Sequence, residues 1–351
     1  MPHHNPNARS QVTMRDVAKA AGVSRMTVSR ALKKDSPVSK ETRDHILKIV
    51  KEMNYVPDQM AGSLTTGKSG FVGVLLPSLN NLHFARTVQS LTEVIEKLDL
   101  QVLLGHTDYS QEREEKIVEM MLRRRPEVMV LSYDGHTDRT IALLRDAAIP
   151  VIEIWETPEK PIQHTVGFSN EKAAFDMTQA LIHRGFKRIV FLGEKQDDWT
   201  RGAARRKGFQ TAMRAAGLND AASFRYGLPP LSIENGAAAV PHLLEKFPDV
   251  DCIFCVSDIA AFGVQSRLQQ MGKSVPDDVS VVGFGNFEVS RFSSPTISTV
   301  VVDPVKIGRC TGELIAKILR QKDLQHESPE HLVVSPEIEF RGSLSKNVIT
   351  Y

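Results

Sequence analysis

The sequence of this 351-residue chain predicts an α/β protein in which a small helical head precedes a two-lobed core. Residues 13–54 carry three short helical patterns, each bounded by residues that commonly start or stop a helix. From residue 70 onward, apolar strand segments alternate with helical segments, which is typical of parallel βαβ units. The alternation begins again near residue 171, and two sets of roughly 100 residues each indicate two similar lobes.

The head is expected to be a helix-turn-helix unit. Its three helices are predicted over 13–22, 24–32 and 39–54. Gly22 permits a tight exit from the first helix, and Ser24 is placed to cap the second. A short turn containing glycine between two helices is the arrangement that this motif requires.

The second helix of the head has two chemically different sides. At 100° per residue, one side holds Arg25, Met26, Ser29 and Arg30 within about 140°. The opposite side holds Thr27, Val28 and Ala31. In a helix-turn-helix, the start of the second helix enters the major groove, where arginine can donate twice to guanine and methionine can touch a thymine methyl. The hydroxyls suited to phosphate are those of Thr13, Ser24, Thr27 and Ser29. The alternative is a three-helix unit with a solvated basic side.

The charge distribution favours a polyanion as the partner of the head. Residues 1–68 contain 12 lysines and arginines against 6 acidic residues, whereas the rest of the chain contains 32 against 36. A basic segment in front of a slightly acidic body is expected of a protein that binds nucleic acid through its head.

The expected division of the chain follows these patterns. It comprises a disordered lead-in at 1–11, a helix-turn-helix DNA-binding domain at 12–57, a hinge at 58–69, a first core lobe at 70–168 plus 298–329, and a second core lobe at 169–297 plus 330–342. Strands are predicted within 70–78, 100–108, 127–135, 150–156, 188–194, 251–258, 279–286 and 331–343. Helices are predicted at 87–99, 112–126, 140–149, 171–185, 204–217, 236–248, 259–272 and 305–321.

Several other classes of protein are disfavoured. Cys252 and Cys255 lie in an apolar run, where residues three apart on a strand point to opposite faces, so a buried strand is expected rather than a metal or redox pair. Three cysteines give no disulfide framework and fit a reducing compartment. No apolar stretch approaches the ~20 residues that span a bilayer, and the polar N-terminus lacks a signal-peptide core. A cytoplasmic protein without a membrane partner is expected.

An enzyme is also disfavoured. The segment GFGNFE at 283–288 lacks the third glycine of a dinucleotide-binding loop and follows the wrong strand. The sequence contains neither GxxxxGK[ST] nor HExxH. We therefore expect no catalytic residues, no cofactor and no metal.

The cleft between the two lobes is the expected small-molecule site, because ligands of open parallel sheets bind at the C-terminal ends of strands. The candidates at predicted strand ends are Phe84, Glu156, Trp199, Arg201, Arg205, Ser257, Asp258 and Asn286. Aromatic surfaces with polar neighbours suit a polyol, and the forked donors of arginine suit a carboxylate or phosphate.

The segments TMRDVAKAAGVSRMTVSRAL and VSKETRDHILKIVKEMNYVPD closely resemble the DNA-binding head of the lactose-repressor family. That family joins this head to a two-lobed core like that of periplasmic sugar-binding proteins, and the resemblance extends over essentially the whole chain. It implies that Arg25, Met26 and Arg30 read the bases of double-stranded operator DNA, that the chain forms a homodimer, and that a small effector binds between the lobes.

The resemblance also assigns roles in the hinge. In the family, paired hinge helices form on operator DNA and insert leucines into the minor groove, a device that unstacks a base step. Leu64 occupies the position of that leucine and Ala61 that of a neighbouring contact. Gly62 departs from the family pattern, and glycine costs a helix about 1 kcal/mol relative to alanine. The alternative is a flexible linker with Leu64 packed on the core.

The effector implied by the resemblance is a sugar acid. Arg205, three residues before GF, matches the family's effector-contacting arginine, and Ser257 stands where the family usually has asparagine. Gly285 replaces the aspartate of sugar-responsive members, which removes a negative charge. The segments VGVLLPSLNNLHFA, IPVIEIWE and RRKGFQTAM are most similar to gluconate-operon repressors. A repressor released by gluconate or a related metabolite is expected. The alternatives are a regulator that responds to a neutral sugar or uses a corepressor, and a solute-binding protein without DNA regulation.

Overall fold

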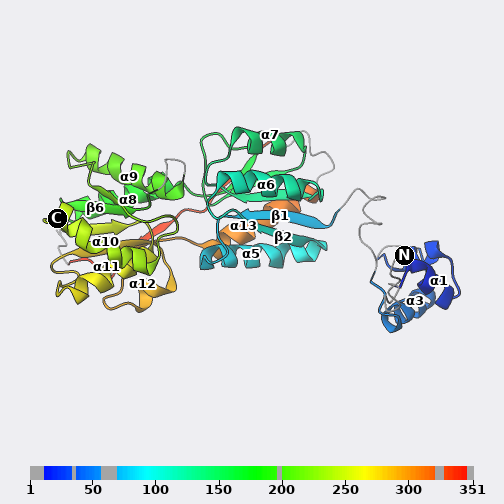
Figure 1. Cartoon of the computed structure of the whole chain (residues 1–351). Helices are drawn as coiled ribbons and strands as arrows, with labels where there is room; N and C mark the ends of the chain where they lie inside the picture. Colours follow the sequence, from blue (N-terminus) through cyan, green and yellow to red (C-terminus); the bar gives the residue numbers. More distant parts are fainter. Residues whose placement is uncertain (1–11, 34–36, 57–68, 196–199, 321–327, 346–351) are drawn as a thin grey trace, which may run out of the picture. The chain divides into compact units, whose positions relative to one another are not determined.

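The computed structural model describes residues 12–33, 37–56, 69–195, 200–320 and 328–345, and these form two compact units divided at residues 69 and 70. The predicted α/β fold, with a helical N-terminal unit and a two-lobed core, is confirmed (Figure 1). None of the helices in these ranges combines the length and apolar character needed to cross a membrane.

The N-terminal unit consists of three helices around a small core. They are α1 Met14–Ala20, α2 Arg25–Ala31 and α3 Lys40–Glu52. Gly22 lies between the first two with φ +65°, a left-handed conformation that favours glycine. The side chains that close the core are those of Val17, Ala18, Ala21, Val28, Ala31, Ile46, Ile49 and Tyr55. The predicted helix-turn-helix arrangement of these segments is therefore present.

The first lobe of the core contains a six-stranded parallel sheet in the order β11-β5-β4-β3-β1-β2. Its strands are β1 Phe71–Leu76, β2 Gln101–His106, β3 Val128–Ser132, β4 Val151–Ile154, β5 His164–Gly167 and β11 His331–Val333. Its helices are α5 Leu82–Ile95, the 3₁₀ turn η1 Glu96–Leu98, α6 Gln111–Leu122, α7 Asp138–Asp146 and α13 Pro304–Arg320. Helices α6 and α7 cover one face of the sheet, and α5 and α13 cover the other (Figure 1).

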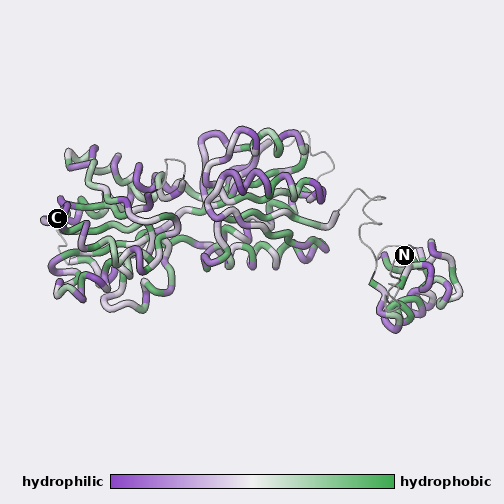
Figure 2. Tube along the Cα trace, viewed as in Figure 1, coloured by the Kyte–Doolittle hydropathy of each residue, from purple (hydrophilic) through white to green (hydrophobic). Residues whose placement is uncertain are grey.

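The second lobe contains another six-stranded sheet, in the order β12-β10-β9-β8-β6-β7, parallel except for the β10–β12 pair. Its strands are β6 Ile189–Gly193, β7 Ser223–Arg225, β8 Cys252–Cys255, β9 Ser280–Gly285, β10 Ser298–Val301 and β12 Glu337–Glu339. Its helices are α8 Asn170–His183, α9 Arg201–Ala215, α10 Ile233–Lys246, α11 Asp258–Gln270 and α12 Glu288–Phe292. In each lobe, the apolar central strands of its own sheet form a buried layer (Figure 2). As expected, Cys252 and Cys255 lie in a fully buried strand.

The C-terminal part of the chain, from residue 298 onward, departs from the expected division of the lobes. Strand β10 pairs with β9 in the second sheet, although residues 298–329 were expected in the first lobe. The predicted single strand 331–343 is two strands, of which β11 completes the first sheet and β12 the second. Pro336, which has no backbone N–H, lies between them. The chain thus passes between the lobes three times within the described residues, after β5, after β10 and after β11.

Helix α13 belongs to the first lobe, as predicted, because it packs closely on α5. A Cβ atom on Gly308 would lie 2.2 Å from the carbonyl oxygen of Thr87, so only glycine allows this approach. The close packing fixes α5, whose N-terminal end carries residues of the candidate site.

Candidate functional site

The outward side of α2 carries the residues predicted to read DNA. Arg25, Met26 and Arg30 are exposed, with 64% of Met26 accessible, whereas Val28 and Ala31 are buried. Ser29 is half-buried. The division of the helix into an apolar inner side and a basic outer side therefore matches the sequence pattern, and the contacts of these residues with DNA stay predictions.

Two of the predicted phosphate-binding hydroxyls also hold the helix ends of the head. The Ser24 hydroxyl oxygen accepts the backbone N–H of Thr27 at 3.1 Å and lies 2.9 Å from the Thr27 hydroxyl. The Thr13 hydroxyl donates to Asp16 at 2.6 Å, and this hydrogen bond lowers the pKa of that carboxyl. Ala61 and Leu64, predicted for the minor groove, lie outside the described residues.

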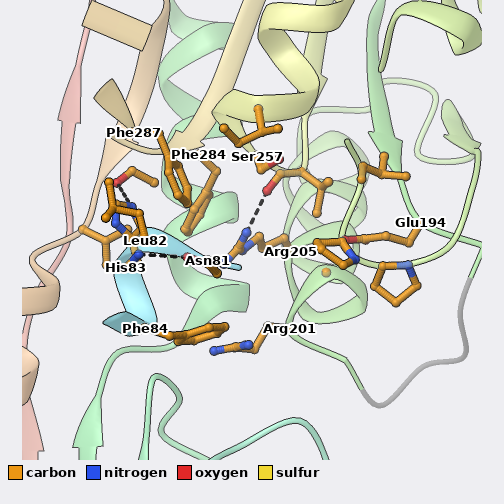
Figure 3. A pocket seen from close by; sticks show the side chains of 18 of the residues that line it. Asn81, Leu82, His83, Phe84, Glu194, Arg201, Arg205, Ser257, Phe284 and Phe287 are labelled. Carbon is orange, nitrogen blue, oxygen red and sulfur yellow. Dashed lines mark hydrogen bonds between the residues drawn. The ribbon is translucent and has the colours of Figure 1, made fainter. Parts of the chain in front are cut away.

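A cavity of about 420 Å³ lies between the two lobes of the core (Figure 3). Its wall is formed mainly by residues that follow β1, β6, β7, β8 and β9, with Asp134 after β3 and Trp155 after β4, so it lies at the C-terminal ends of both sheets, as predicted. Of the predicted set, Phe84, Arg201, Arg205 and Ser257 line the cavity.

Arg205 is a positively charged residue of the cavity wall whose hydrogen-bond partners, among the described residues, are neutral. Its Nε donates to the Asn170 side-chain oxygen at 2.8 Å, and its Nη1 donates to the carbonyl oxygen of Val256 at 2.7 Å. The guanidinium carbon lies 3.7 Å from the centre of the Phe284 ring. Burial, and then the nearby charge of Arg201, lowers the pKa of Arg205 to about 10, so the side chain stays protonated at neutral pH. In the described part of the chain, no carboxylate forms an ion pair with it.

Glu156 supports Arg205 from behind the cavity wall instead of lining it. Its carboxylate accepts the Asn170 side-chain N–H at 2.9 Å and the backbone N–H groups of Asn170 and Thr157. Asn170 in turn receives Arg205. Burial raises the pKa of Glu156, and the donated hydrogen bonds oppose that rise. The prediction of a direct effector contact therefore changes to a role in orienting Asn170.

Asp258 and Asn286, also predicted as effector residues, are not among the residues that line the cavity. The fully buried Asp258 accepts the Thr299 hydroxyl at 2.6 Å and the backbone N–H of Phe287 at 2.7 Å. Burial raises the pKa of Asp258 to about 6. The side-chain oxygen of Asn286 accepts from Arg341 at 2.7 Å. These hydrogen bonds hold the loop after β9 in place, since they engage the Asp258 carboxylate and the side-chain oxygen of Asn286.

Ser257 lines the cavity and also caps α11, since its hydroxyl oxygen accepts the backbone N–H of Ala260 at 3.3 Å. Trp199 lies outside the described residues. Among the described residues, no group of three or more histidine, cysteine, aspartate or glutamate side chains is arranged to hold a metal ion.

Among the residues of the cavity wall that sequence reasoning missed are His83, Tyr109, Asp134 and Glu194. His83 and Asp134 make contacts between lobes, which no local pattern indicates. Glu194 directly follows β6, so its position at a strand end was the available signal. Burial raises the pKa of Glu194.

His83 and Phe287 occupy the space beside Gly285. The two rings stack with their centres 3.8 Å apart, and His83 Nε2 lies 2.7 Å from the carbonyl oxygen of Gly285. Burial lowers the pKa of His83 to about 4, so the neutral ring donates through Nε2. A Cβ on Gly285 would lie 2.6 Å from the Phe287 ring and 3.2 Å from His83 Nε2. The space available to an aspartate side chain at this position is therefore filled.

We expect Gly285→Ala to destabilise the core more than Gly272→Ala. Both glycines have positive φ, +125° and +76°, but a Cβ on Gly272 would meet no atom within 4 Å. Backbone strain alone costs about 1–2 kcal/mol, and overpacking against the stacked rings adds about 1–3 kcal/mol. Urea unfolding midpoints of the two variants measure the difference, and equal losses would show that the rings move aside without cost.

Comparisons with known proteins identify both units. The profile "Bacterial regulatory proteins, lacI family" matches residues 13–58, and that of a "Periplasmic binding protein-like domain" matches residues 178–344. The transcriptional regulator IdnR of Escherichia coli K12 is 31% identical over 320 residues, which cover 91% of this chain and 95% of that protein. The regulator GntR of the same organism is 32% identical over 314 residues, which cover 88% of this chain and 93% of that protein.

Solved structures agree with these matches. A LacI family transcriptional regulator from Silicibacter pomeroyi is 65% identical, with a TM-score of 0.75 over 79% of this chain and 99% of that chain. The lac repressor dimer bound to operator and the anti-inducer ONPF has a TM-score of 0.82 over 96% of this chain and 100% of that chain. At 21% identity, this second likeness concerns the fold alone.

A helix-turn-helix head with a basic outer side, joined to a two-lobed core with an internal cavity, defines a DNA-binding regulator of transcription. The relatives are transcriptional regulators rather than enzymes. The chain belongs to the LacI family of bacterial regulatory proteins, whose members bind operator DNA and small-molecule effectors.

Proposed function

We propose that this protein is a dimeric repressor that leaves its operator when a sugar acid, gluconate or a related metabolite, binds between the core lobes. The observation that carries the proposal is the half-buried guanidinium of Arg205, which lines the cavity and, within the described residues, donates to the neutral acceptors Asn170 and Val256. A buried charge is stabilised by an opposite charge with matching hydrogen bonds, and a carboxylate matches the fork of arginine. An effector carboxylate would supply that partner.

The rest of the cavity suits a polyhydroxylated body. Aromatic surfaces from Phe84 and Phe287 flank it, and polar groups of Asn80, Ser257 and Glu194 lie on its wall. Carboxylate and amide groups accept hydrogen bonds from sugar hydroxyls. Position 285 also supports a sugar acid as the effector. The aspartate that sugar-responsive members carry there is absent, and Phe287 and His83 fill the space that its side chain would need.

On the DNA side, we propose that two copies place α2 in successive major grooves of a pseudo-palindromic operator. Arg25, Met26 and Arg30 would contact base edges, with phosphate contacts from Thr13, Ser24, Thr27 and Ser29. Effector binding would change the affinity for operator only to the extent that the effector binds the two states of the core differently.

Calorimetric titration with gluconate, 6-phosphogluconate and glucose tests the choice of effector, together with gel shifts on the operator. We expect gluconate to bind and to release the operator, and glucose to do neither. Release by glucose alone would replace the sugar acid with a neutral sugar. Tighter operator binding on addition of gluconate would make it a corepressor, and an operator shift that none of these compounds alters would contradict the sensor role.

A further inference from the structure

The two arginines of the cavity wall have different surroundings. Arg201, the first residue of α9 in the second lobe, reaches Asp134, which follows β3 in the first lobe. Its Nε and Nη2 donate to the two carboxylate oxygens of Asp134 at 3.1 and 3.0 Å, and its Nη1 donates to the Ser132 hydroxyl at 3.1 Å. This bidentate pair therefore joins the lobes directly, whereas the hydrogen bonds of Arg205 among the described residues go to Asn170 and Val256 of its own lobe.

The environment of the pair makes the link between the lobes strong. The side chains of Arg201 and Asp134 are each only 9% exposed. The Asp134 carboxylate also accepts the backbone N–H of Arg201 at 3.3 Å, at the N-terminal end of the 15-residue helix α9, where a negative charge is favoured. The guanidinium carbon lies 5.0 Å from the centre of the Phe84 ring, a residue of the first lobe. Among the described residues, the groups that bind the Arg201 side chain, Asp134, Ser132 and Phe84, all belong to the opposite lobe.

A second contact joins the lobes at another part of the cavity. His83, on α5 of the first lobe, lies 2.7 Å from the carbonyl oxygen of Gly285, which ends β9 of the second lobe. Because this contact is a neutral hydrogen bond, it constrains the lobes less than the buried ion pair does. The figure of the cavity shows Arg201 beside Phe84 and His83 nearer Phe287 (Figure 3).

We propose that Arg201 and Asp134 form a clasp that holds the lobes together around the effector, so that Arg201 is a positioning residue and Arg205 alone receives the effector's carboxylate. The guanidinium of Arg201 already has a carboxylate of the chain as its partner, and its charge is offset there. Breaking a buried ion pair by removing one partner is strongly unfavourable, because the other charge stays buried. A core without the clasp relieves that cost by separating the lobes.

The proposal predicts that two substitutions with opposite effects on the charge of the cavity change the affinity for gluconate in the same direction. Asp134→Asn adds positive charge to the cavity, and Arg201→Gln removes it. If the pair acted only through its electric field, gluconate would bind more tightly to the first variant and more weakly to the second. A clasp instead predicts weaker binding in both, on the order of 10- to 100-fold. The variant Asp134→Asn/Arg201→Gln should be no weaker than the singles, since each single change already breaks the link.

The separation of the lobes can be measured without any effector, using pulsed electron spin resonance between nitroxide labels on the full chain. Exposed Ala142 on α7 and exposed Ala215 on α9 can each be replaced by cysteine, in a Cys310→Ser background that removes the partly exposed native thiol. We expect a longer or broader distance distribution for Asp134→Asn and Arg201→Gln. Asp176→Asn, which breaks the exposed Lys172–Asp176 pair within the second lobe, is the matched control and should leave the distribution unchanged.

The effect on effector affinity rests on the proposed function, whereas the distance measurement does not. Unchanged distances in both variants, or opposite changes in gluconate affinity, would overturn the clasp. If gluconate fails to bind the unaltered chain while the distances change as expected, the clasp stands and only the proposed effector fails. Thermal unfolding checks that each variant is folded, and Arg201→Lys, which keeps the charge but loses the fork, replaces any variant that is not.

Discussion

Arg205→Ala should abolish the response to effector while leaving the protein bound to its operator. The guanidinium lies half-buried in the cavity wall and is oriented by Asn170 and by the carbonyl oxygen of Val256. Removing one member of a buried, hydrogen-bonded charge pair costs about 2–4 kcal/mol, which corresponds to roughly a 30- to 1000-fold loss of affinity. Calorimetric titration with gluconate and a gel shift at increasing gluconate concentrations measure the two halves of this prediction.

Arg214→Ala provides a control on the same helix. Arg214 lies near the end of α9, is exposed, and pairs with Asp220 on the surface. Its loss removes the same charge and side-chain type without touching the cavity, and exposed ion pairs contribute only about 0–1 kcal/mol. If gluconate still releases the operator from the Arg205→Ala variant, the carboxylate of the effector binds elsewhere.

Arg25→Ala should weaken binding to the operator more than binding to unrelated DNA. Arg25 is the first residue of α2, and its side chain is exposed. It lies at the N-terminal end of the helix, which is predicted to enter the major groove. A bidentate contact between arginine and guanine contributes about 1–3 kcal/mol of discrimination between bases. Gel shifts with the operator and with a scrambled duplex, at one salt concentration, give the specificity ratio.

Arg15→Ala separates the loss of a base contact from the loss of charge. Arg15 is exposed on α1, which in this motif lies outside the groove. Loss of a phosphate-binding charge weakens binding to both duplexes about equally. An equal loss for Arg25→Ala would remove Arg25 from the set of base-reading residues.

The sequence predicts the regular part of the fold because that part depends on local patterns. The buried strands β3 and β9 and the helices between them follow from apolar runs and helical spacing. Strands β5, β7 and β10 were not predicted, since they have three or four residues and include polar side chains. Their existence depends on pairing with distant strands, and this is also why the residues that form β10 and β11 were assigned to the wrong lobes.

The sequence predicts those residues of the candidate site that reach the cavity because they follow the end of a strand. Arg205 and Phe84 lie at the cavity wall as expected, because each follows a strand end. Asp258 and Asn286 also follow a strand end, but the protein's own donors satisfy them, which only the packed loop reveals. Asp134 shows the opposite case. Its partner is 67 residues away in the other lobe, so no local pattern predicts their contact.

The distribution of β11 and β12 between the two sheets affects how the protein folds during synthesis. The first sheet is complete only with residues 331–333 and the second only with residues 337–339. Domains generally fold as units while the chain emerges from the ribosome, N-terminal units first. Here the head can fold early on its own core, but the edge of β5 waits from residue 167 until β11 is made at residue 331, and the edge of β10 waits from residue 301 until β12 is made at residue 337. The nascent core therefore exposes an unfinished sheet edge until β11 and β12 emerge.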